Sequence, residues 1–152
     1  ASVHDVAAFI LRERGPMTAM KLQKLVYYCQ AWSLVWDDAP MFAERIRAWK
    51  NGPVCGDLYH EHRGRYEIKP GDLPKGDPDT LTAAQRETVL EVLRSYGDKT
   101  SQWLSDLTHA EDPWRNARAQ AHDGEASSPE ITLASMAEYY GSLDERTACS
   151  LG

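Results

Sequence analysis

The sequence lacks the features that mark secreted and membrane-spanning proteins. No run of apolar residues approaches the roughly 20 that a membrane-spanning helix needs. The opening stretch, ASVHDVAAF, has neither a basic start nor an apolar signal core. The three cysteines, Cys29, Cys55 and Cys149, are odd in number and form no C-x-x-C pair. We therefore expect a cytoplasmic protein with reduced cysteines, in which Cys29 packs in the core. Cys55 would be a candidate reactive thiol only if it were exposed.

Sequence motifs of enzymes are also missing. The chain contains no G-x-S-x-G, no Walker-type glycine loop, no G-x-G-x-x-G and no H-E-x-x-H. His60 and His62 are two residues apart, so on a helix their imidazoles would point to different sides and could not hold one ion together. On a strand they could, but no third ligand nearby has the right spacing. We expect no metal and no cofactor.

His109 leaves two interpretations open. It is followed by Glu111 and Asp112, so it could be a general base held by a carboxylate. Alternatively, the segment is a polar junction between two helices. His109 and Thr108 would then form hydrogen bonds with free backbone groups at the helix ends. We favour the junction, because a base without a nucleophile or a cofactor is not a mechanism. The sequence thus predicts a protein that is not an enzyme, and a hydrolase centred on His60, His62 and His109 remains the rival hypothesis.

Charge is distributed unevenly along the chain. The net charge is −6, yet residues 1–50 carry seven Lys/Arg against five Asp/Glu, while residues 51–152 carry ten against eighteen. Such a surface would repel a phosphate backbone over most of its area, so we do not expect nucleic acid as a partner, and it could bind only locally. A DNA-binding regulator that uses the basic first third stays an alternative.

Length and periodicity predict one compact, mainly α-helical domain. The 152 residues suit a single core. Ser2 and Asp5 resemble a capping box, and an apolar stripe follows up to Arg14. Thr18 is the expected cap of a second helix that continues to about Trp36. Because aromatic and apolar residues cover most of the circumference of this second helix, we expect it to lie at the centre, surrounded by the others.

The middle of the chain predicts a small amount of β structure. Residues 44–49, ERIRAW, alternate polar with apolar side chains as a half-buried strand does. A short helix from Val54 to His62 and a second short strand from Tyr66 to Lys69 are expected to follow. We therefore predict a β-hairpin or a pair of short strands near residues 44–69.

The last third of the chain predicts further helices. The expected segments are a dispensable surface loop over residues 70–79, a helix from Thr82 to Gly97, helices opening at Ser101 and Asp112, a linker over residues 122–130, and a last helix from Thr132 to Tyr140. Gly141 is expected to end the last helix. The predicted domain therefore covers residues 1–141, and residues 142–152 form a C-terminal tail.

The bend after Trp49 is the predicted site for a partner. A tryptophan just before a Gly-Pro bend can pack against the core, or it can stand at a surface rim as a contact for another protein, and the sequence leaves both uses open. The candidate partner-binding residues are Trp49, Gly52, Pro53, Val54 and Tyr59.

Four separated blocks of sequence resemble one known family. The blocks are D-V-A-x-F-I-L, K-L-Q-K-L-V-Y-Y-C-Q-A-W, F-A-E-R-I-R-A-W-x-x-G-P-V-x-x-x-L-Y and L-T-H-A-E-D-P-W-x-x-A-R. Their order, from about Asp5 to Arg118, looks like the Panacea antitoxin domain, also called SocA-like and described as phage-associated GepA-like. The closing stretch ITLASMAEYY is similar as well.

The resemblance implies a bacterial or phage protein that acts as the antitoxin of a toxin-antitoxin system. Its partner would be a cognate protein toxin encoded nearby, which it binds and holds inactive. One branch of the family works instead as a protease adaptor, which presents its toxin to an ATP-dependent protease for degradation. Neither role is an enzymatic activity of the domain.

Overall fold

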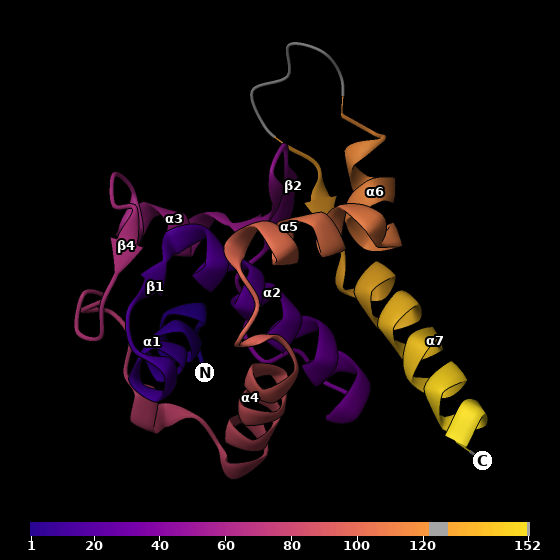
Figure 1. Ribbon diagram of the computed structural model, residues 1–152, viewed down its shortest axis with the longest axis horizontal. Coiled ribbons are helices and arrows are strands. Elements are labelled where there is room, and N and C mark those ends of the chain that lie inside the picture. Colours follow the sequence, from indigo (N-terminus) through magenta and orange to yellow (C-terminus); the bar gives the residue numbers. More distant parts are fainter. Residues whose placement is uncertain (122–127, 152) are drawn as a thin grey trace.

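The computed structural model describes residues 1–121 and 128–151, with side chains up to Asp144. Seven α-helices and two small antiparallel sheets make up this part of the chain (Figure 1). The helices are α1 (Val3–Arg14), α2 (Ala19–Trp36), α3 (Gly56–His62), α4 (Ala83–Tyr96), α5 (Ser101–Ala110), α6 (Asp112–Arg118) and α7 (Leu133–Leu151). The strands are β1 (Met17–Thr18), β2 (Ile46–Trp49), β3 (Gly52–Cys55), β4 (Glu67–Ile68) and β5 (Glu130–Ile131), and η1 (Pro78–Thr80) is a 3₁₀ turn.

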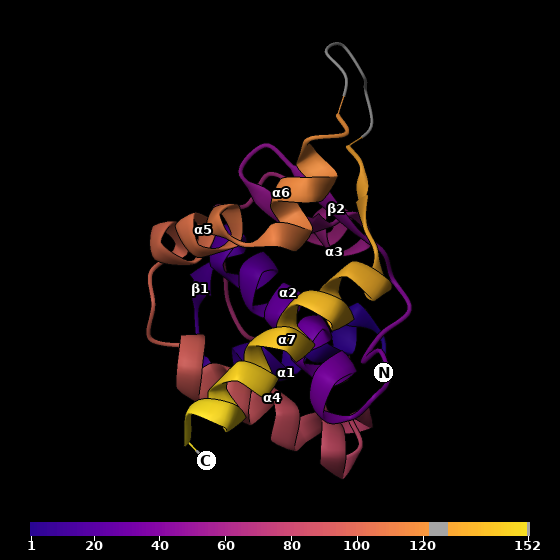
Figure 2. The same ribbon diagram turned by 90° about the vertical axis from the view of Figure 1, so that its right-hand side faces the viewer.

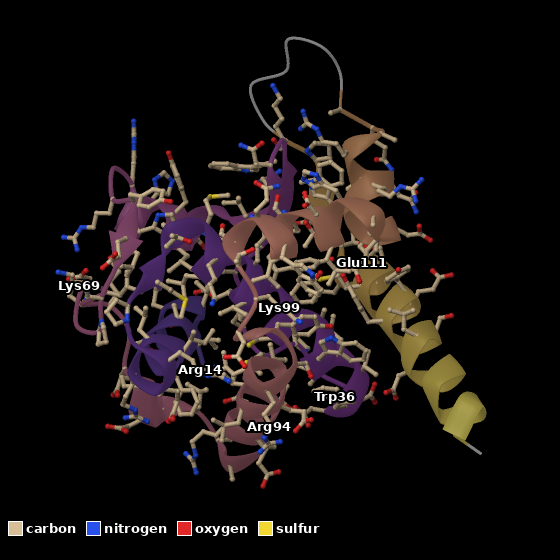
Figure 3. The ribbon with its side chains drawn as sticks, viewed as in Figure 1. Arg14, Trp36, Lys69, Arg94, Lys99 and Glu111 are labelled. Carbon is tan, nitrogen blue, oxygen red and sulfur yellow. The ribbon has the colours of Figure 1, made fainter. Side chains whose placement is uncertain are left out.

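Helix α2 lies at the centre, as its sequence predicts. It contacts α1, α4, α5 and α7, and α7 crosses over it (Figure 2). Every residue from Leu22 to Ala31 is buried, including polar ones. The C-terminal end of α2 reaches the surface, where Trp36 is 41% exposed (Figure 3). The mainly α-helical fold around an aromatic-rich helix is therefore confirmed.

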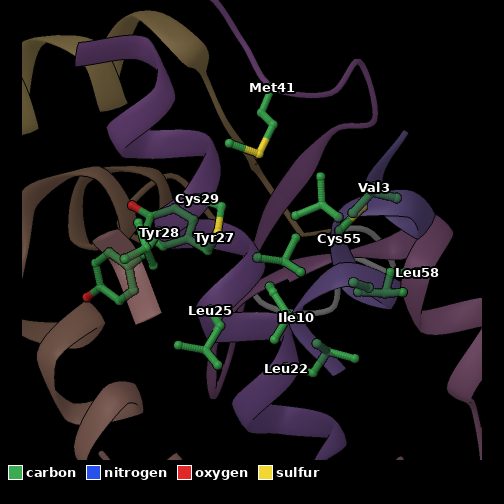
Figure 4. Close-up of a cluster of buried hydrophobic side chains, with 14 of the residues drawn as sticks. Val3, Ile10, Leu22, Leu25, Tyr27, Tyr28, Cys29, Met41, Cys55 and Leu58 are labelled. Carbon is green, nitrogen blue, oxygen red and sulfur yellow. The ribbon is translucent and has the colours of Figure 1, made fainter. Parts of the chain in front are cut away.

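The core is built on the apolar and aromatic residues of α2. Leu22 and Leu25 pack with Ile10 of α1, and Cys29 is fully buried, as expected (Figure 4). The rings of Tyr27 and Tyr28 are also buried, with centroids 5.2 Å apart. Burial of one such side chain contributes on the order of 2 to 3 kcal/mol, which explains why so many large residues are concentrated in this helix.

Side-chain caps fix the helix starts where the sequence predicts them. The hydroxyl of Ser2 accepts from the N–H of Asp5 at 3.2 Å, and the Asp5 carboxylate accepts from the N–H of Ser2 at 2.9 Å. Thr82 and Gln85 form the same reciprocal pair at the start of α4. These local signals account for the accuracy of the predicted N-terminal boundaries.

The predicted small amount of β structure near residues 44–69 is confirmed, but the expected helix start at Val54 is wrong, because β3 covers Gly52–Cys55 and α3 begins at Gly56. Strands β2 and β3 pair in antiparallel register, with Ile46 opposite Cys55 and Trp49 opposite Gly52, and β5 adds to the other edge of β2. The strand expected at 66–69 exists as β4. It pairs with β1 and forms a separate two-stranded sheet.

Helix α7 shows that the predicted end at Gly141 is wrong. The helix continues to Leu151. A glycine inside a helix costs about 1 kcal/mol but does not end it when neighbouring residues pack. Here Tyr140 is fully buried and Leu143 packs against the core. The division of the chain into a domain and a tail at this residue remains a prediction.

Residues 122–127 of the predicted linker lie outside the described residues, and Glu130 at its end belongs to β5. The loop at 70–79 lies at the surface but is attached to α1, because the N–H of Asp77 donates to the Asp5 carboxylate at 2.8 Å. In the part of the chain that the structure covers, no helix combines the length and the apolar composition that crossing a membrane requires.

Candidate partner-binding site

The site predicted from the sequence is the tip of the β2–β3 hairpin. Trp49 and Gly52 form the last residue pair of the two strands, and Lys50 and Asn51 form the turn between them. Gly52 has a φ of 127°, and a Cβ at this position would lie 2.5 Å from Cε of Lys24. Glycine is therefore required here both by the backbone conformation and by the close approach of α2.

Trp49 and Tyr59 form an aromatic pair beside the hairpin. Their ring centroids are 4.9 Å apart at an interplanar angle of 65°, an edge-to-face arrangement. Both side chains are half-buried, whereas Gly52, Pro53 and Val54 are buried. Of the five predicted contact residues, Trp49 and Tyr59 therefore expose side-chain surface that a partner could touch. The other three are buried beneath that surface. Their role in partner binding stays a prediction.

Gln23 of α2 binds the outer edge of β3. Its Nε2 donates to the carbonyl of Cys55 at 3.2 Å, and its Oε1 accepts from the N–H of Cys55 at 2.9 Å. The side-chain amide therefore occupies the place of a neighbouring strand. The same Nε2 lies 3.0 Å from Nε2 of His62, so this ring nitrogen must accept, and the network assigns the proton to Nδ1. Burial lowers the pKa of His62, which agrees with a neutral ring.

Lys24 makes a second attachment next to Gln23. The side chain is fully buried, and its Nζ donates to the carbonyl of Pro53 at 3.3 Å. Burial lowers the pKa of Lys24 to about 8, because desolvation disfavours the ammonium. The group is still mostly charged at pH 7 and depends on backbone dipoles for stabilisation.

Side chains of α5 and α6 hold the hairpin from another direction. Each of them donates to a backbone carbonyl of β2 or of the turn. The bonds are Trp114 Nε1 to Trp49 at 2.8 Å, Arg118 to Ala48 at 3.1 Å and Ser105 to Asn51 at 2.8 Å. The hairpin tip is therefore a rigid surface, and it requires little ordering on binding.

A buried carboxylate organises the junction of α5, α6 and α7. Oε1 of Glu111 accepts from the hydroxyl of Tyr28 at 2.6 Å and from the hydroxyl of Tyr140 at 2.8 Å, and its position is marked in Figure 3. The hydroxyl of Tyr27 lies 3.1 Å from that of Tyr140. Burial raises the pKa of Glu111, and the two tyrosine bonds oppose this shift. The cluster joins α2 to α7.

The histidines do not form a catalytic arrangement with this carboxylate. Glu111 is bound to two tyrosines, and the ring of His109 instead stacks on Trp114, with centroids 4.0 Å apart. His109 therefore does not cap the junction as expected, although the Thr108 hydroxyl does bond a backbone carbonyl, that of Ser105.

The pair His60 and His62 lies on α3, where His60 is exposed and His62 is buried. The two rings thus point to different environments, as the helical spacing predicts. Within residues 1–121 and 128–144, no three His, Cys, Asp or Glu side chains gather closely enough to hold a metal ion. Cys55 is buried, and burial raises its pKa to about 11, so it does not meet the condition for a reactive thiol. The side chain of Cys149 lies outside the described residues.

A pocket next to Tyr59 was not predicted from the sequence. It has a volume of about 170 Å³ and is mostly apolar. Its lining includes Ala19, Met20, Tyr59, His62, Tyr66 and Ser101. The only signal for it in the sequence is Tyr66, a large ring in the charged stretch RGRYEIK.

The chain matches a model of a known protein family. The family model described as "Antitoxin SocA-like, Panacea domain" matches residues 22–115, which is more than half of the chain. The matched range contains Gln23, Lys24, Glu111 and Trp114, all of which make the internal bonds described above. Comparisons with curated proteins and with solved structures found no match.

Proposed function

We propose, from the premise that this chain belongs to the family of SocA-like antitoxins with a Panacea domain, that it neutralises a cognate protein toxin by binding it directly. Family membership is the observation that carries this proposal, since an antitoxin family implies a protein toxin as partner. The chain itself catalyses no reaction in this scheme. Inhibition then follows the occupancy of the complex, so it depends on the concentration and affinity of the two proteins.

The hairpin tip supports a binding role. Tryptophan and tyrosine are enriched at the energetically important positions of protein interfaces. Trp49 offers such a side chain on a backbone that is held by α2, α5 and α6, and Tyr59 of α3 packs against its ring. A preorganised surface of this kind loses little conformational entropy when a partner binds.

The proposal is tested by co-expression with the neighbouring open reading frame. The product of that frame should arrest growth when it is expressed alone, and this chain should restore growth and co-purify with it. The lifetime of the toxin separates the two modes of action. Direct blocking leaves the lifetime unchanged or longer, and a protease adaptor shortens it. Growth arrest that persists despite soluble antitoxin would overturn the proposal.

Side-chain removal at the hairpin tests the predicted contacts. Trp49→Ala and Tyr59→Ala should each raise the dissociation constant of the toxin complex at least about tenfold, as expected for aromatic hot spots. The bond from Trp114 reaches the backbone carbonyl of residue 49, so Trp49→Ala leaves it in place. Trp36→Ala removes another exposed tryptophan, away from the hairpin, and should bind like the wild type.

A further inference from the structure

We propose that the pocket between the starts of α2 and α5 receives one apolar side chain of the toxin, from a segment that carries a carboxylate beside that side chain. This inference rests on the proposed function and names the chemistry of the contact. The occupant is thus an acidic, apolar segment of a protein. The walls, the rim and the charge around the pocket each support this occupant.

The walls of the pocket suit a single apolar group. Its volume of about 170 Å³ is close to that of an apolar cavity of about 150 Å³ that holds benzene. Ala19 and Met20 from α2 and Tyr59 from α3 supply apolar lining. A phenylalanine or leucine side chain would fill the space, and its transfer from water would stabilise the complex.

The rim of the pocket carries the most exposed large apolar side chain of the described residues. Tyr66 is 83% exposed, whereas Tyr59 is half-buried. The backbone beneath Tyr66 is held in place, since the carbonyl of Tyr66 accepts from the N–H of Ala19 at 2.9 Å, and the N–H of Arg65 donates to the carbonyl of His62 at 2.9 Å. An aromatic ring presented on fixed backbone is typical of an interface residue.

The electrostatics of the pocket favour a carboxylate. Helix α2 begins at Ala19 and α5 begins at Ser101, so the positive ends of two helix dipoles meet at one pocket. Arg65 lines the pocket, and Arg63 is exposed close by in the sequence. Asp72 offsets part of this charge, because it pairs with Arg65 at 3.3 Å.

Glu67 is a second acidic residue in the stretch that contains Arg65. Even with both acids counted, residues 63–72 carry three basic side chains against two acidic ones in a chain whose net charge is −6. An acidic segment of a protein fits this local field. A nucleic acid strand fits it poorly, because the rest of the surface repels its phosphates.

The first experiment measures binding of the full chain to the toxin from the neighbouring frame. Tyr66→Ser and Arg65→Glu should each raise the dissociation constant at least about tenfold without changing the melting temperature, since both side chains are mostly exposed. Trp103→Ser and Arg12→Glu are matched controls. The first alters another exposed aromatic residue, and the second breaks another exposed arginine–aspartate pair. Both controls should bind within twofold of the wild type.

The outcomes separate this inference from the proposed function. If the wild type restores growth and both pocket variants bind as tightly as it does, the pocket assignment is wrong and the antitoxin function stands. If the wild type does not restore growth, the proposed function fails, and the pocket is judged by a second experiment that needs no toxin.

The second experiment selects displayed random 12-residue peptides on the purified full chain, with counter-selection on the Tyr66→Ser variant. The expected peptides carry an aromatic residue or leucine next to Asp or Glu, and their amide chemical-shift changes should map to Met20, Tyr59, Tyr66 and Ser101. Peptides without this pattern, or shifts elsewhere, would refute the assignment. Single-stranded DNA that binds at Tyr66 with steep salt dependence would also refute it, in favour of a nucleic-acid site.

Discussion

Gln23, Lys24 and Gln30 of α2 are buried polar residues, and each of them binds backbone groups elsewhere in the chain. Gln23 and Lys24 bind β3, and Gln30 bonds the backbone of Met41 and Phe42. Helical periodicity alone treats such residues as surface positions. Their partners lie 11 to 32 residues away in the sequence, so no local pattern reveals these bonds. This is why the polar part of the core was not predicted.

Lys24 makes the stability of the protein depend on pH in a specific window. Its pKa is lowered from 10.5 in the unfolded chain to about 8 in the folded chain. Between these values the unfolded state binds more protons, so the contribution of Lys24 to stability rises with pH, by about 3 kcal/mol in total. Replacement by methionine, which has a similar shape and no charge, should abolish this rise.

The measurement is a comparison of urea unfolding at several pH values from 7 to 10.5. The buried thiols of Cys29 and Cys55 have raised pKa values and oppose the effect above pH 9, so the informative quantity is the difference between wild type and Lys24→Met. That difference should grow in favour of the wild type as pH rises. Lys50→Met, in the exposed turn, should follow the wild type at every pH. A constant difference for Lys24→Met would show that the ammonium is not desolvated.

Gly52 is a residue at which a single added methyl group should destabilise the fold. Gly52→Ala combines a left-handed φ with a contact against Lys24, so we expect a loss of about 2 to 4 kcal/mol in the free energy of unfolding. Gly64→Ala provides the control, because Gly64 has a φ of 85° but open space around it. It should cost only about 1 kcal/mol. Equal losses would mean that the contact with Lys24 contributes nothing.

At the scale of elements, local signals predicted the helices well and the strand pairing poorly. The caps at Ser2, Thr18 and Thr82 are bonds between residues three apart, so the sequence contains all that determines them. The pairing of β4 with β1 joins residues about 50 positions apart. The continuation of α7 through Gly141 depends on packing against α2. These features are decided by tertiary contacts, which local patterns do not record.

The attachment of α7 through Glu111 can be tested with two substitutions. Both tyrosine bonds reach the same oxygen, Oε1, so Glu111→Gln can keep them while removing a buried charge, and stability should change by less than about 1 kcal/mol. Glu111→Ala leaves the hydroxyls of Tyr28 and Tyr140 without this acceptor and should cost about 2 to 4 kcal/mol.

Hydrogen exchange shows whether this loss concerns α7. Amides of the helix around Tyr140 should exchange faster in Glu111→Ala than in the wild type, with smaller changes in α1. Glu138→Ala, an exposed change on α7 itself, should leave exchange and stability unaltered. Equal stability of the alanine and glutamine variants at position 111 would exclude a role for the two bonds.

At the scale of the whole molecule, the candidate surface is formed by segments that are far apart in sequence. The sequence predicted Trp49 and Tyr59 as partner contacts, and these two residues lie close together in the sequence. It could not predict the pocket, because Met20, Tyr59 and Ser101 come from three different helices. The blocks that identify the family are mostly buried and hold the hairpin. They therefore determine the framework more directly than the surface that a toxin would touch.

The loop at residues 70–79 can be tested for its contribution to the stability of the core. The sequence predicted a dispensable surface loop, but Leu73 is buried, and the N–H of Asp77 bonds Asp5 on α1. Replacing residues 70–79 by a short glycine-serine linker should therefore cost about 2 to 4 kcal/mol, mainly from the lost burial of Leu73.

Single substitutions separate the sources of this loss. Leu73→Ala should account for most of it, with a loss of at least about 2 kcal/mol. Asp79→Ala breaks only an exposed pair with Arg12 and should cost less than about 1 kcal/mol. The measurement is urea unfolding of the full chain. If the linker variant were as stable as the wild type, the loop would contribute nothing to the core. The contacts between the loop and α1 would then form without stabilising the fold.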